Sequence, residues 1–86
     1  PRYVTAKKKV PLGDLDARAA LDALAERHRE ADVSTVDGVK IDLKDGWVHV
    51  RPSNTEPILR VYAEARTRED AEALAEQFMD EITAEA

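Results

Sequence analysis

The residues best suited to chemistry stand together in one short segment, Arg51 to Pro57, with the sequence RPSNTEP. Arg51 presents a planar fork of N–H groups that can meet two phosphate oxygens at once. Ser53, Asn54 and Thr55 add hydroxyl and amide donors, and successive backbone N–H groups in such a turn can converge on an anion. The two prolines restrict both ends, which lowers the entropy lost on binding. The pattern predicts a preformed phosphate-binding loop.

The same residue types also allow simpler interpretations of this segment. Serine, asparagine and threonine are common turn residues, and an arginine at a strand end is often just solvated. Glu56 repels an anion unless it pairs with an arginine, for which Arg60 is the candidate. Ser53 has no adjacent histidine in the sequence, so a nucleophilic role is not favoured. We therefore expect no catalytic residue in this segment.

The histidines and carboxylates elsewhere form no recognisable catalytic or metal-binding pattern. His28 falls on the apolar stripe of a predicted helix, where we expect a satisfied, partly buried side chain rather than a catalyst. No cluster of His, Asp and Glu has ligand spacing outside the predicted solvated helix faces. The sequence therefore predicts no metal site.

The composition predicts one small domain over residues 1–86. The chain has 18 acidic and 13 basic side chains, a formal net charge of −5 and no cysteine, which excludes disulfides. No apolar run approaches the roughly 20 residues of a membrane span, so we expect no membrane partner. With no signal peptide visible, we expect a cytoplasmic location. Because Pro1 stands where an initiating methionine is usual, we expect a segment of a longer protein.

The strands around the loop are predicted from the alternation of apolar and polar residues. Residues 39–43 alternate with period two, and residues 47–51 return with Val48 and Val50 on one face. Asp45-Gly46 predicts the hairpin between them, because glycine accepts the positive φ of tight hairpin turns. We expect residues 58–64 to form the next strand and residues 2–6 to form a short first strand.

Two helices complete the predicted fold. One spans residues 15–30 with Asp14 as its N-cap, and the second follows Thr67 with Asp70 at the capping-box position. The apolar residues of the second recur at spacings of three and four: Ala71, Leu74, Ala75, Phe78, Met79 and Ile82. The order β-α-β-β-β-α predicts an α+β fold, an antiparallel four-stranded sheet with two helices on one face.

A sheet of this kind is also compatible with two other classes of protein. A nucleic-acid-binding module would stack bases on Trp47 and Tyr62, but the net acidity and the low aromatic content of 5% argue against nucleic acid. The three adjacent lysines within residues 1–12 are typical of an edge strand or a solvated turn. The other alternative is a structural interaction module, whose open sheet face around Trp47, His49 and Tyr62 packs on a neighbour.

Residues 37–65, DGVKIDLKDGWVHVRPSNTEPILRVYAEA, closely resemble the C-terminal domain of the α-D-phosphohexomutases. The members most similar are bacterial and archaeal phosphomannomutase/phosphoglucomutases. The RPSNTEP loop is the specific part of the resemblance, and the element order agrees along nearly the whole chain. The resemblance implies a TATA-box-binding-protein-like fold.

The resemblance also implies a role for the chain within a four-domain isomerase. Such enzymes interconvert hexose 1-phosphates and 6-phosphates of glucose or mannose, with a phosphoserine in the first domain and Mg²⁺ bound by the second. The fourth domain grips the phosphate that is not transferred, and by motif position its ligands would be Arg51, Ser53, Asn54 and Thr55. Because this chain lacks the phosphoserine and metal loops, we expect it to be inactive alone. The related phosphoglucosamine mutases typically have glycine at the position of Asn54, which favours the mannose/glucose branch.

Overall fold

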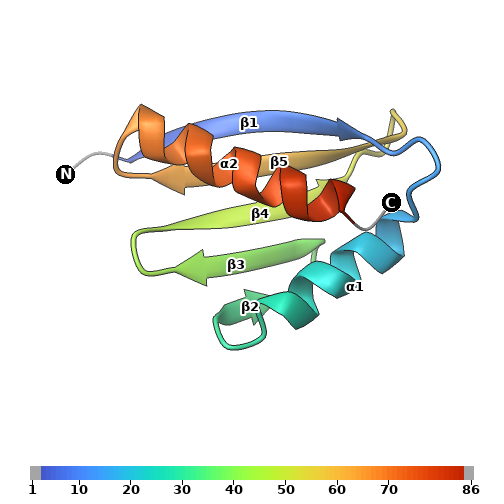
Figure 1. Ribbon diagram of the computed structural model, residues 1–86, viewed down its shortest axis with the longest axis horizontal. Helices are drawn as coiled ribbons and strands as arrows, with labels where there is room; N and C mark the ends of the chain where they lie inside the picture. The colour runs from blue at the N-terminus through green and yellow to red at the C-terminus, as the bar shows by residue number, and fades with distance from the viewer. Residues whose placement is uncertain (1–2, 85–86) are drawn as a thin grey trace.

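The computed structural model describes residues 3–84, which form one antiparallel sheet and two helices. In chain order the elements are β1 (Val4–Pro11), α1 (Ala17–Arg27), β2 (Asp32–Ser34), β3 (Val39–Leu43), β4 (Gly46–Pro52), β5 (Ile58–Ala65) and α2 (Arg68–Thr83). The strands lie in the order β1-β5-β4-β3-β2, and both helices cover the same face of the sheet (Figure 1). The predicted α+β class is confirmed.

The sheet has five strands where the sequence predicted four. The additional strand, β2, pairs antiparallel with β3 at the edge of the sheet, with Val33 opposite Ile41. With three residues, of which only Val33 is apolar, its alternation is too short to identify a strand from the sequence. The strand forms because the chain leaving α1 passes alongside β3, a tertiary effect that local patterns do not report.

The first strand and the first helix have different bounds from those predicted. β1 continues to Pro11, because it pairs with the whole length of β5; Arg2, where the predicted strand began, lies outside the described residues. Asp14 is not the helix N-cap. A turn closed by the Leu15 N–H on the Leu12 carbonyl at 2.7 Å delays the helix, and Asp16 caps it by accepting from the Ala19 N–H at 3.2 Å.

The hydrophobic core lies between the sheet and the two helices, as the alternation predicted. Val48 and Val50 of β4 are fully buried against the helices, while their neighbours Trp47 and His49 lie on the helix-free face. The largest fully buried side chain, Phe78, comes from α2. Within residues 3–84 every buried side chain is apolar, and no helix there is long and apolar enough to cross a membrane. The helix-free face therefore carries the polar side chains of the sheet.

Gly46 permits the β3–β4 hairpin for a reason other than the one predicted. The hairpin is present, with Leu43 paired to Gly46, but the φ of Gly46 is not positive. A Cβ at this position would lie 2.0 Å from the carbonyl oxygen of Glu64 on β5. Glycine is needed here because the neighbouring backbone approaches too closely for any side chain.

Candidate phosphate-binding loop

The predicted loop connects β4 to β5 at one end of the sheet, opposite the end that holds the β3–β4 hairpin (Figure 1). The Ser53 N–H donates to the Ile58 carbonyl at 3.1 Å and closes the loop. The strand register places Arg51 directly opposite Arg60 on the helix-free face. Like charges directly opposite each other on two strands are unfavourable unless anionic groups accompany them.

The hydroxyl of Ser53 organises the backbone of the loop. Its Oγ accepts hydrogen bonds from the N–H groups of Thr55 at 3.2 Å and Glu56 at 3.3 Å. It also lies 3.4 Å from the hydroxyl of Thr55. This local pattern is typical of serine in turns and fixes the path of the chain without further structure. It directs two backbone N–H groups to Ser53 and leaves the hydroxyl proton of Ser53 as a donor.

Each arginine beside the loop has a carboxylate partner. Arg51 lies 3.7 Å from the carboxylate of Asp37, and its guanidinium lies 5.4 Å from the ring centre of Tyr62. Arg60 donates to the carboxylate of Glu56 at 3.3 Å, which confirms the predicted pairing of these two residues. All four charged groups are at least partly exposed, so each pair contributes about 0–1 kcal/mol to stability.

The loop borders a surface hollow of about 570 Å³ on the described part of the chain. Its lining consists of Val36, Asp37, Gly38, Arg51, Pro52, Ser53, Asn54, Thr55 and Arg60. The four residues predicted as phosphate ligands are therefore brought together in one place. Sequence reasoning did not assign Arg60 or residues 36–38 to this hollow. The alternation of the two predicted strands puts Arg51 and Arg60 on the face away from the core, so part of that signal was present, but their register was not predicted. Residues 36–38 reach the hollow through tertiary packing.

Gly38 brings the segment of residues 36–38 against the loop. It has a φ of +69°, and a Cβ there would lie 2.3 Å from the Val50 carbonyl oxygen and 2.8 Å from the Cβ of Arg51. The connection from β2 to β3 therefore packs directly on β4 at Gly38. In addition, the His49 Nε2 lies 2.6 Å from the Asp37 carbonyl oxygen. Because a carbonyl oxygen only accepts, Nε2 of His49 carries the proton in this contact.

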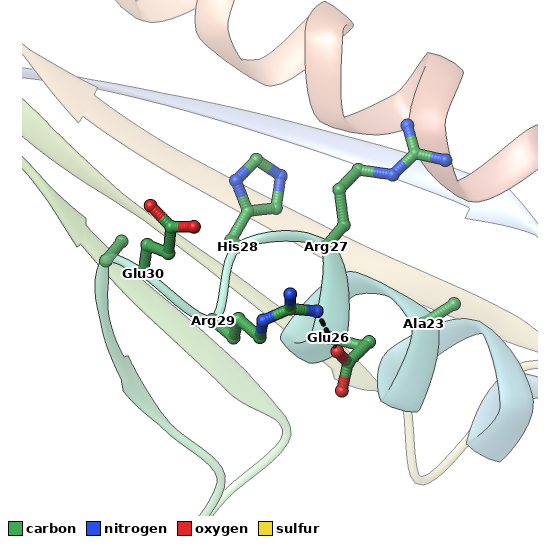
Figure 2. A pocket seen from close by; sticks show the side chains of 7 residues that line it. Ala23, Glu26, Arg27, His28, Arg29 and Glu30 are labelled. Atoms are coloured by element: carbon green, nitrogen blue, oxygen red, sulfur yellow. Dashed lines mark hydrogen bonds and ion pairs between the residues drawn. The ribbon is translucent and has the colours of Figure 1, made fainter.

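A second hollow, of about 700 Å³, lies at the end of α1 and is lined by charged side chains (Figure 2). Figure 2 shows Glu26 paired with Arg29 at its edge. His28, also drawn there, contacts Glu81 at 2.7 Å and stacks on Phe78 with ring centres 4.8 Å apart. Its side chain is only 18% exposed, which confirms the expected satisfied, partly buried histidine. This hollow holds none of the predicted ligands.

An ion pair between β1 and α2, away from the loop, shifts the pKa of both of its groups. The Lys8 ammonium lies 2.6 Å from the Glu72 carboxylate and ties β1 to α2. The hydrogen bond and charge of Glu72 raise the pKa of Lys8, and the hydrogen bond from Lys8 lowers the pKa of Glu72. Within residues 3–84, no three His, Asp or Glu side chains are grouped so as to hold a metal ion.

These features define a two-layer α+β domain with an arginine-flanked polar loop at one end of its open sheet. The family described as "Phosphoglucomutase/phosphomannomutase, C-terminal domain" matches residues 4–81, which include the whole loop. The chain belongs to this family.

Individual relatives agree with this assignment. The chain is 42% identical over 82 residues to a probable phosphoglucosamine mutase of Methanopyrus kandleri, and 44% identical over 81 residues to one of Pyrococcus abyssi. These matches cover 93% and 90% of the chain but only 18% of each relative. A crystal structure of a phosphoglucomutase/phosphomannomutase family protein from Burkholderia thailandensis has the same fold, with a TM-score of 0.70, 24% identity and coverage of 98% of this chain and 18% of that one.

Proposed function

We propose that this chain holds the non-transferred phosphate of a hexose phosphate while a phosphohexomutase moves a phosphoryl group between the 1- and 6-positions. Arg51 supplies the charge-assisted contact, Ser53 and Thr55 supply hydroxyl donors, and Asn54 supplies amide donors. The observation that carries the proposal is that these four residues line one hollow, with a second arginine directly opposite Arg51. Two arginines at opposed strand positions, both lining this hollow, favour an anion there.

The proposed role divides the chemistry between this chain and the rest of a longer enzyme. A phosphoserine and a Mg²⁺ site in other domains would carry out the transfer, and the isolated chain is inactive in this account. Its exposed hollow binds a hexose phosphate weakly, near −4 kcal/mol or about millimolar. In a closed cytoplasmic enzyme the same contacts position the sugar for transfer.

The substrate has two candidates. The resemblance described above favours glucose or mannose phosphates, because phosphoglucosamine mutases typically have glycine at the position of Asn54. The second candidate is a glucosamine phosphate, which is favoured by the names of the archaeal relatives at 42% and 44% identity. The ratio of kcat/KM values for glucosamine, glucose and mannose 6-phosphates in the full-length enzyme decides between them. A preference for glucosamine phosphate of more than tenfold contradicts the first candidate.

Binding at the loop is tested by following the backbone amide signals of the 86-residue chain by NMR. Glucose 1-phosphate should shift the amides of residues 51–56, and glucose alone should not. The proposal is wrong if the phosphate ester shifts only the amide signals of residues 23 and 26–31, which line the other hollow, or shifts none at high millimolar concentration.

A further inference from the structure

The Asp37 carboxylate forms an ion pair with Arg51, a residue distant from it in the sequence. The two residues are 14 positions apart, and Asp37 Oδ2 lies 3.7 Å from Arg51 Nη1. The backbone of Asp37 is held by the packing of Gly38 on Val50 and by the hydrogen bond from His49. Neither contact uses the carboxylate, so the turn stays in place whether or not that carboxylate meets Arg51.

The same hollow has a matching arrangement at its second arginine. Arg60 is paired with Glu56, which also lies 3.8 Å from the ammonium of Lys9. Since Arg51 and Arg60 are directly opposite, each needs a negative partner in the absence of ligand. Glu56 belongs to the loop itself, whereas Asp37 comes from a separate turn. Within residues 3–84, the one ion pair that Asp37 forms is with Arg51.

We propose that Asp37 is an internal competitor for the anion, a residue that lowers the affinity of the hollow by occupying the Arg51 guanidinium until phosphate displaces it. The inference rests on the phosphate-binding role proposed above. Arg51 is 43% exposed and Asp37 is 73% exposed, so solvent screens the pair and the competition is modest. A phosphate ester carries about 1.5–2 negative charges at neutral pH, against one on the carboxylate, and can use the arginine fork in a bidentate manner. Phosphate therefore displaces Asp37 from Arg51, but it binds less tightly than it would if Asp37 carried no charge.

The chain contains a matched control for Asp37 at the other end of the sheet. Asp45 is also a turn residue, is 68% exposed, and lies 3.8 Å from Arg66. Asp45→Asn and Asp37→Asn remove the same charge from similar ion pairs. Only Asp37→Asn changes a group that lines the hollow, and the substitution leaves the size of the side chain and the backbone contacts of the turn unchanged.

The experiment measures the Kd of inorganic phosphate by NMR titration for the wild-type chain, Asp37→Asn and Asp45→Asn at constant ionic strength. We expect Asp37→Asn to bind about threefold to fivefold more tightly, the factor that loss of an exposed ion pair of up to about 1 kcal/mol allows, and Asp45→Asn to stay within twofold of wild type. If wild type binds but Asp37→Asn binds no more tightly, the competitor role is wrong and the phosphate site stands.

Two further outcomes also decide the matter. Equal tightening by Asp37→Asn and Asp45→Asn overturns the competitor role, because the effect is then one of net charge. If phosphate shifts the amide signals of residues 51–56 in none of the three chains, the phosphate-binding function itself is wrong. The spectrum of Asp37→Asn without ligand checks that the signal of His49, which is distant from the substitution in the sequence, keeps its position.

Discussion

Arg51→Ala in the full-length enzyme that carries this chain is expected to impair substrate binding while leaving the domain folded. The side chain is 43% exposed and lies on the helix-free face, outside the core. Its backbone pairs with Arg60, and that ladder does not depend on the guanidinium. The substitution also relieves the opposed positive charges of Arg51 and Arg60, so we expect the free energy of unfolding to change by less than about 1 kcal/mol.

The size of the functional effect follows from the contacts that Arg51 exchanges on binding. A hydrogen bond to a charged group contributes about 1.5–3 kcal/mol net. Displacing Asp37 costs up to about 1 kcal/mol, which leaves a loss near 2 kcal/mol in the variant. That loss lowers kcat/KM about thirtyfold. In the proposed role the phosphate beside Arg51 is held alike before and during transfer. The change should therefore appear mainly as a higher KM with little change in kcat.

Steady-state mutase kinetics of wild type, Arg51→Ala and Arg66→Ala test this reasoning. Arg66→Ala removes the same charge from an arginine that is 59% exposed and pairs with Asp45 far from the loop. It should keep kcat/KM within threefold of wild type. A kcat/KM of Arg51→Ala within threefold of wild type, or an equal loss of activity in both variants, would refute a binding role for Arg51.

Three other expectations concern the loop and the stability of the isolated chain. Ser53→Ala removes the acceptor of two loop N–H groups, a loss of about 1 kcal/mol or more of hydrogen bonding. In an NMR titration it should weaken phosphate binding about fivefold to tenfold, and unchanged affinity would show that the loop is ordered by other means. In urea unfolding, Gly46→Ala should cost about 3 kcal/mol through its clash with the β5 backbone. Gly13→Ala, with φ +54° but open space around it, should cost only about 1–2 kcal/mol, and equal costs would contradict the close approach. The lowered pKa of Glu72 contributes stability that is present above its ordinary pKa and is lost as the pH falls through the lowered value. Acid should therefore destabilise wild type more than Glu72→Gln, and parallel curves of unfolding free energy against pH would exclude this contribution.

The sequence allowed the class of the fold and the composition of the candidate site to be predicted, because both depend on local signals. Alternation in β3, β4 and β5 identified the buried face, and this face includes Val48 and Val50. Five of the seven residues of the RPSNTEP loop are polar, and the predicted pairing of Glu56 with Arg60 is present. These signals require only the strand period and the hairpin register.

The features that could not be predicted arise from contacts between distant parts of the chain. β2 exists because it lies beside β3, and Gly46 is needed because β5 passes close to it. The placement of Asp37 on Arg51 depends on the packing of Gly38 against β4, which no local pattern reports. The sequence thus indicated the groups proposed to bind an anion but not the carboxylate that lies beside Arg51.

The most direct test of the phosphate-binding claim is a crystal structure of the chain with glucose 1-phosphate at a concentration well above its Kd. The account predicts the phosphate in the hollow beside the loop, with oxygens about 2.7–3.0 Å from the Arg51 guanidinium and from the hydroxyls of Ser53 and Thr55. Asp37 should then have moved away from Arg51. Phosphate bound in the other hollow, or a loop without ligand while Asp37 still contacts Arg51, would contradict the account.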